Sequence, residues 1–159
     1  MSYKTKRTLT NLIMGVILLC IYVVLAVGKY PSEESLSAWA IFILIFIGIS
    51  VVVLIITQIV FHIAFYIGTM AKEKCDDKEA DRIMTSSEIE DEMDKLISLK
   101  STRVGYVCFG FGFIATLAAL ALEASPIIAL NVIFISFMIG TLVEGCASIY
   151  LYCRGVKNG

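Results

Sequence analysis

Four long apolar stretches dominate this chain of 159 residues and constrain what it can fold into. They run over residues 9–28, 36–70, 104–122 and 127–152, while Lys, Arg, Asp and Glu crowd into the segments between them. Each stretch reaches or exceeds the ~20 apolar residues that a helix needs to cross the ~30 Å of hydrocarbon in a bilayer. The hydrophobic content of 58% also exceeds the ~45–50% that is typical of soluble domains. We therefore predict one all-α integral membrane domain over residues 1–159, a bundle of four transmembrane helices.

The distribution of basic residues predicts the orientation of this bundle. If the N-terminus lies inside, every Lys and Arg except Lys29 falls in an inner segment. Membrane proteins keep an excess of Lys and Arg in their cytoplasmic loops. We therefore expect a multi-pass protein of the cell membrane, with both termini and the loop at 72–103 in the cytoplasm.

The loop at 72–103 contains one segment with helical periodicity. Ser87 and Glu90 have the spacing of a capping box, which satisfies free backbone N–H groups at a helix start. We predict an amphipathic helix over 88–100 that leads into the third transmembrane helix. Its apolar side either lies against the inner membrane surface, packs beneath the bundle or contacts a protein partner. Its acidic residues favour a protein, because helices that bind anionic lipid are usually rich in Lys and Arg. The expected contact residues are Ile89, Met93, Leu96 and Ile97.

Small residues recur along the third and fourth stretches. Helices in lipid gain nothing from hydrophobic association, so close backbone approach at small residues must hold them together. We therefore expect these two helices to pack tightly, within one chain or across a homodimer. The predicted packing residues are Gly105, Cys108, Gly112, Ala115 and Ala119 on the third helix, and Ser136, Gly140 and Ala147 on the fourth.

Glu144 is the only acidic or basic residue in the stretch 127–152. A carboxyl group in hydrocarbon costs at least ~2.5 kcal/mol on insertion scales, so its presence requires a reason. Ser136, Gly140 and Ser148 share its side of the helix at four-residue spacing. Ten residues separate Glu144 from Arg154, which places the carboxyl about 15 Å from the cytoplasmic charges.

The second stretch carries a matching polar row on one helix side. Counting back from Lys72 places His62 at the same depth of about 15 Å, whereas counting forward from Trp39 places it at the inner interface. The two counts differ because the stretch 36–70 is longer than a bilayer needs. Both counts put His62 and Glu144 in the cytoplasmic half of the membrane. The row consists of Gln58, His62, Tyr66 and Thr69.

Two interpretations of these polar groups remain open. In the first, His62 and Glu144 face each other with Gln58 or Tyr66 and bind a proton, a cation or a basic ligand. In the second, they form a structural hydrogen bond between helices, typically worth only ~0.6 kcal/mol.

Several classes of function lack any signal in the chain. The sequence has one histidine, no metal-ligand spacing, no phosphate-binding loop and no nucleophile–base pair. We therefore expect no metal, no cofactor and no enzymatic activity. The net charge of −1 gives no reason to expect nucleic acid as a partner.

The stretch D-E-M-D-K-L-I-S-L-K-S-T-R-V-G-Y at 91–106 resembles a D-E-R-D-x-x-I-x-x-K-x-x-R-x-x-Y pattern. That pattern precedes the third helix in a family of small four-helix membrane proteins of unknown function from clostridia and archaea. Met93 replaces the arginine, which puts in doubt any salt bridge made at that position in the family. The resemblance implies a four-helix membrane fold, a sensory or regulatory partner such as a short helix-turn-helix regulator, and no defined activity. The matching residues are Asp91, Glu92, Asp94, Ile97, Lys100, Arg103 and Tyr106.

The sequence thus supports two functional hypotheses. The leading one is a non-enzymatic membrane protein that acts through protein–protein interaction, as an accessory, regulatory or immunity-type component, with its cytoplasmic loop as the contact surface. The alternative is a small oligomeric proton- or cation-linked transporter or channel that uses Glu144 and His62.

Overall fold

The computed structural model describes residues 3–28, 35–73 and 91–154, which form four helices with a short turn at 122–125 and contain no strand. All four helices are long and apolar enough to cross a membrane. The chain is therefore an all-α, multi-pass membrane protein, which confirms the predicted fold class. The helices are α1 (Tyr3–Val27), α2 (Leu36–Glu73), α4 (Glu92–Ala121) and α5 (Pro126–Arg154).

Helix α4 begins at a capping box. The Asp91 carboxylate accepts a hydrogen bond from the Glu92 N–H at 2.7 Å, and the Asp91 N–H donates to the Asp94 carboxylate at 3.0 Å. These bonds satisfy backbone N–H groups that have no partner inside a helix. From this start α4 continues without a break through the apolar stretch. The predicted capping pair Ser87–Glu90 and the first residues of the predicted amphipathic helix lie outside the described residues.

The first two helices extend beyond their apolar stretches. Helix α1 begins at Tyr3, so Lys4, Lys6 and Arg7 are part of it. Helix α2 has 38 residues and a length of about 57 Å, well above the ~30 Å of the hydrocarbon layer. Basic and polar side chains therefore lie on the same rigid helices as the membrane-spanning residues.

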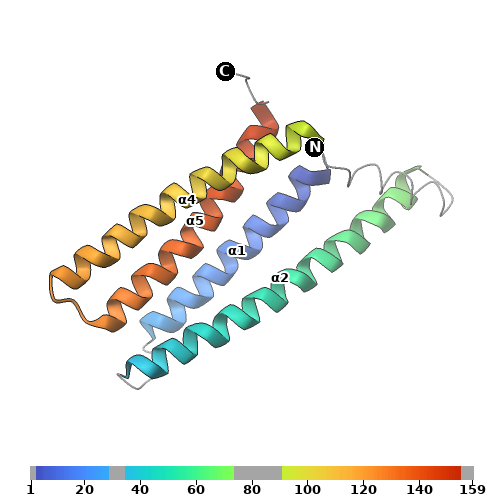
Figure 1. Cartoon of the computed structure of the whole chain (residues 1–159). Helices are drawn as coiled ribbons and strands as arrows, with labels where there is room; N and C mark the ends of the chain where they lie inside the picture. The colour runs from blue at the N-terminus through green and yellow to red at the C-terminus, as the bar shows by residue number, and fades with distance from the viewer. Residues whose placement is uncertain (1–2, 29–34, 74–90, 155–159) are drawn as a thin grey trace.

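The helices lie side by side in the order α4, α5, α1, α2, each antiparallel to its neighbour (Figure 1). Contact is most extensive between α4 and α5, and α2 touches α5 only slightly. Helices α1 and α4 begin at the end of the bundle where α2 and α5 finish. We call this the charged end, because the basic residues of α1 and the acidic start of α4 gather there.

Tyr22 is the centre of the core in the half of the bundle away from the charged end. Its side chain is fully buried, and its ring packs against Phe46 and Phe134 with centroid separations of 5.2 and 4.6 Å. Its hydroxyl donates a hydrogen bond of 2.6 Å to the side-chain oxygen of Asn131 on α5. Aromatic contact and one intramembrane hydrogen bond therefore join α1, α2 and α5.

Small residues bring α4 and α5 together within one chain. A Cβ added to Gly105 would lie 3.1 Å from the carbonyl oxygen of Gly140, and one added to Gly112 would lie 2.1 Å from the Cβ of Ser136. The next residue of the seam is Thr116, which is buried, because positions four apart share a helix side. Of the other residues predicted for this packing, Ala115 is exposed, whereas Cys108, Ala119 and Ala147 are half-buried.

Candidate functional site

A polar cavity of about 480 Å³ lies at the charged end, between residues of all four helices. Its volume falls within the ~300–1,000 Å³ usual for small-ligand sites. Charged side chains of both signs line it, together with hydroxyl and amide groups. The lining consists of Tyr3, Lys4, Arg7, Thr8, Asn11, Leu12 and Gly15 on α1, Leu54 and Gln58 on α2, Asp94, Ser98 and Ser101 on α4, and Thr141, Leu142, Glu144, Gly145, Ser148 and Tyr152 on α5.

Glu144 lies where α5 packs against α4. Its carboxylate accepts a hydrogen bond of 2.6 Å from the hydroxyl of Thr102. Gly105 provides the space for the acid, because a Cβ added there would lie 3.0 Å from the Glu144 Cβ. In the described part of the chain no cationic side chain forms an ion pair with Glu144. A neutral hydroxyl is therefore the hydrogen-bond partner of this half-buried carboxylate.

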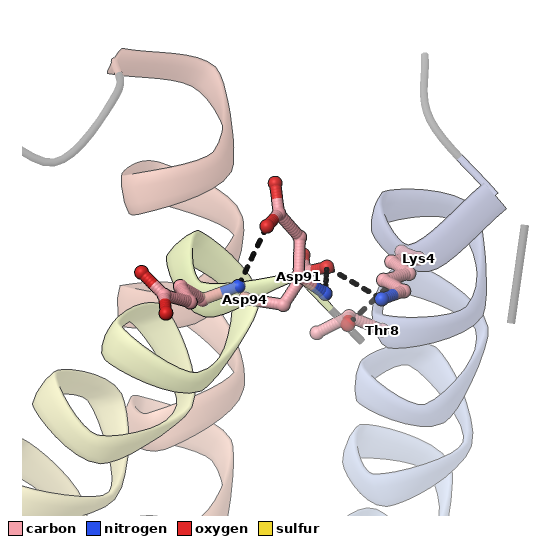
Figure 2. A network of polar contacts seen from close by, with 5 residues as sticks. Lys4, Thr8, Asp91 and Asp94 are labelled. Atoms are coloured by element: carbon pink, nitrogen blue, oxygen red, sulfur yellow. Dashed lines mark hydrogen bonds and ion pairs between the residues drawn. The ribbon is translucent and has the colours of Figure 1, made fainter. Parts of the chain in front are cut away.

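An ion pair between two residues that line the cavity joins α1 to the start of α4. The Lys4 ammonium lies 2.5 Å from the Asp94 carboxylate, and both side chains are less than one-fifth exposed. Tyr152 of α5 donates a further hydrogen bond to Asp94. Figure 2 shows Lys4 of α1 beside the capping box that Asp91 and Asp94 form. This network connects three helices next to the cavity.

Arg7 and Gln58 connect the remaining helix to the cavity. The Arg7 guanidinium donates a hydrogen bond of 2.7 Å to the side-chain oxygen of Gln58 on α2. Within residues 3–28, 35–73 and 91–154, no carboxylate pairs with Arg7. The cavity therefore contains one paired cation, Lys4, and one cation whose hydrogen-bond partner is neutral.

His62 lies at another level of the bundle than Glu144. Its Nδ1 is 3.5 Å from the hydroxyl of Tyr3, whereas a Cβ added to Gly145, the neighbour of Glu144, would lie 2.8 Å from a Leu12 methyl group. Tyr3 and Leu12 are nine residues apart on α1, a rise of about 14 Å. The structure therefore does not bring His62 and Glu144 together.

The overlong helix α2 explains this separation. The depth count from Lys72 assumes that Lys72 lies at the inner interface, but α2 has 38 residues, about 57 Å, and extends well beyond a hydrocarbon layer of ~30 Å. The count from Trp39, which places His62 at the interface, agrees with the contact between His62 and the first residue of α1. Of the predicted polar row, only Gln58 lines the same cavity as Glu144; Tyr66 is half-buried outside this lining.

The residues predicted to contact a partner divide between the core and the surface. Ile97 is 1% exposed and packs inside the bundle, so its side chain is not available to a partner. Met93 and Leu96 are 51% and 41% exposed. Ile89 lies outside the described residues.

Three features of the molecule were not predicted from the sequence. The sequence connects Arg7 only with the orientation of the bundle, since nothing in one sequence shows that α1 begins early enough to place this residue in a cavity. The Tyr22–Asn131 hydrogen bond had a usable signal, because Asn131 is a polar residue inside an apolar stretch, as Glu144 is. Thr102 had none, since its role depends on how α4 and α5 align.

The described residues contain no group of three or more His, Cys, Asp or Glu side chains that could hold a metal ion. Beside the Lys4–Asp94 ion pair, the cavity can offer one carboxylate, one guanidinium and several neutral oxygens to a ligand.

In comparisons with protein-family models, curated proteins and solved structures, no match to the chain was found.

Proposed function

We propose that the protein binds a proton or a small cation at Glu144, as the binding step of transport or sensing across the membrane. The observation that supports this most directly is the carboxylate of Glu144, which lines a polar cavity and has a hydroxyl as its hydrogen-bond partner. A half-buried carboxylate on a membrane-spanning helix, with no counter-ion among the described residues, is stabilised when it binds a proton or a cation. Binding of a proton or a small cation would therefore explain why an acid occupies this position.

The hydroxyl groups around the cavity suit a cation better than an anion. Ser101 donates its hydroxyl hydrogen to the carbonyl of Ser98, and Thr141 donates to the carbonyl of Phe137. A hydroxyl that already donates retains lone pairs that can accept from an ammonium or coordinate a metal cation. A single carboxylate among such oxygens favours a monovalent cation.

The orientation and assembly belong to the same proposal. The excess of Lys and Arg at the charged end supports a cell-membrane protein with both termini in the cytoplasm, so that the cavity faces the cytoplasm. The aromatic core around Tyr22 fills the other half of the bundle. Passage across the membrane therefore requires a second copy of the chain or a rearrangement of this core. The proposed role is non-enzymatic.

Cation-dependent stability and flux test this proposal. The purified chain is heated at constant ionic strength in sodium, potassium, ethylammonium or N-methylglucamine chloride, and flux is measured after reconstitution into liposomes. Ligands that bind only the folded state raise its melting temperature. We expect one of the small cations, or a change in pH, to stabilise the wild type and to drive flux.

Glu144→Gln should abolish both responses, because it removes the charge and keeps the shape. Glu92→Gln is the matched control, since Glu92 is exposed on α4 and does not line the cavity. A wild type that shows neither stabilisation nor flux with any of these ions, at any pH, contradicts the proposal.

A second function, protein–protein interaction, is favoured by a row of exposed apolar side chains on α4. Met93, Leu96 and Leu99 are 51%, 41% and 69% exposed and precede the apolar stretch of the helix. They are three residues apart and therefore form one exposed row along α4, beside the buried Ile97. A row of exposed apolar side chains suits a protein partner. This supports the regulatory partner that the family resemblance implies.

Site-specific photocrosslinking in native membranes tests this second function. A photoreactive residue at Leu96 should capture one defined protein, which mass spectrometry identifies. The control is the same residue at Tyr106, which is 72% exposed farther along α4, in its apolar part. Capture of lipid alone at both positions argues against an interaction surface here.

A further inference from the structure

We infer that the cavity takes a small zwitterion, with an ammonium group at Glu144 and a carboxylate or phosphate group at Arg7. This inference rests on the proposed cation site and adds the second, anionic half of the ligand. It follows from the charges of the cavity and from their positions along the helices.

The charges in the cavity balance only in part. Lys4 and Asp94 neutralise each other in an ion pair of 2.5 Å. Arg7 donates to the neutral amide of Gln58, and Glu144 accepts from the neutral hydroxyl of Thr102. Within the described residues, neither Arg7 nor Glu144 has a partner of opposite charge. One positive and one negative group therefore line the same cavity without ion pairs.

These two groups lie at different levels of the bundle. Gly145, next to Glu144, abuts Leu12, and Arg7 is five residues closer to the charged end on α1, a rise of about 8 Å. A ligand that reaches both therefore lies along the cavity, with its cationic end deeper in the bundle. Its charged groups must be several bonds apart.

A ligand with a single charge would leave one of the two groups uncompensated. Glu144 is half-buried, so leaving its charge uncompensated is costly and the cavity discriminates against a ligand without a cationic group; the exposed Arg7 adds attraction for an anionic group. A zwitterion satisfies both groups through charge-assisted hydrogen bonds. The volume of about 480 Å³ accommodates a ligand of the size of phosphoethanolamine. The same chemistry occurs in a free solute and in the headgroup of phosphatidylethanolamine.

Titration calorimetry with the full-length wild type in detergent tests the inference. The probes are phosphoethanolamine, ethylammonium chloride and sodium phosphate. We expect phosphoethanolamine to bind at least about tenfold more tightly than either single-charge probe, since each charge-assisted bond contributes about that factor. Arg7→Gln and Glu144→Gln should each weaken its binding about tenfold.

Lys6→Gln is the matched control for Arg7→Gln and should leave binding unchanged, since Lys6 is basic and exposed on the same helix but does not line the cavity. Arg7 is itself exposed, so Arg7→Gln tests the inference even if Glu144→Gln does not fold. Equal binding of ethylammonium and phosphoethanolamine, lost only in Glu144→Gln, overturns the zwitterion and leaves the cation site standing. Absence of binding by all three probes overturns both.

The source of the zwitterion is resolved in nanodiscs of phosphatidylethanolamine and phosphatidylglycerol in equal amounts. Retention of phosphatidylethanolamine by the wild type in native mass spectrometry, with loss in both cavity variants, supports the lipid headgroup. Binding of free phosphoethanolamine without such retention supports a soluble ligand. Retention that is unchanged in both variants, together with no binding of the soluble probe, overturns the inference.

Discussion

Replacement of Gly112 by alanine tests how closely α4 and α5 approach. The added Cβ would lie 2.1 Å from the Cβ and 2.3 Å from the hydroxyl oxygen of Ser136. Carbon atoms that are not bonded pack at about 3.5–4.0 Å, so the two helices would have to separate locally by about 1.4 Å. The Cβ of Ser136 cannot rotate away, because the backbone of α5 fixes its position.

The size of the effect follows from two opposing contributions. Alanine is favoured over glycine inside a helix by about 0.8–1.0 kcal/mol, and this gain applies at any helical position. Overpacking a close contact costs about 1–3 kcal/mol. Gly110 provides the matched control, because a Cβ added there would meet nothing within 4 Å. Gly112→Ala should therefore be less stable than Gly110→Ala by about 1–3 kcal/mol, although the two variants have the same composition.

Equilibrium unfolding of both variants in mixed micelles, with increasing sodium dodecyl sulfate and helicity as the signal, measures this difference. Gly112→Ala should unfold at a lower dodecyl sulfate fraction than the wild type, and Gly110→Ala at the same or a higher fraction. A difference of 1.4 kcal/mol is a tenfold change in the folded-to-unfolded ratio, well within reach of the assay. Equal stability of the two variants would refute the close approach of α4 and α5.

Three further substitutions test other contacts by the same unfolding measurement. Glu123 follows α4 with a φ of 61°, a left-handed conformation that glycine adopts without cost. Glu123→Gly should therefore stabilise the protein by about 1 kcal/mol, and an equal gain in Glu123→Ala would contradict this cause. Tyr22→Phe keeps the aromatic contacts but removes the hydrogen bond to Asn131, so we expect a loss of about 0.6 kcal/mol and no more than about 1.7; no loss would mean that the bond is not formed. Asp94→Asn removes the ion pair with Lys4 and weakens the cap of α4, and should cost about 1 kcal/mol; a double-mutant cycle with Lys4→Gln isolates the pair, and zero coupling would show that it contributes nothing.

The secondary structure of this chain could be predicted because lipid imposes a simple requirement. A stretch of about 20 apolar residues in a bilayer must form a helix, since every backbone polar group has to be satisfied internally. This requirement located all four helices. It said little about their ends, because polar residues such as Lys4 and Asp94 continue the helices in water or at the interface, where lipid imposes nothing.

The site could be predicted only in part, because its geometry depends on how helices align. Glu144 was identified from its chemistry alone, and the structure places it in the cavity. Counting residues along α2 does not fix the position of its proposed neighbour His62, because a helix longer than the bilayer has no unique register against the others. Thr102, the actual hydrogen-bond partner, lies where α4 and α5 approach, a contact set by Gly105 and Gly140 rather than by any polar pattern.

Because α4 is continuous from Glu92 to Ala121, it can transmit a movement along its length as one rigid element. Near its N-terminal end, Asp94 forms an ion pair with α1. Eight residues farther along, at a distance of about 12 Å, Thr102 donates a hydrogen bond to the carboxylate of Glu144. A displacement of the N-terminal end of α4 would therefore move Thr102 as well, because no break in the helix lies between them. A contact made at the start of α4 and the hydrogen bond to Glu144 are thus mechanically coupled through one helix.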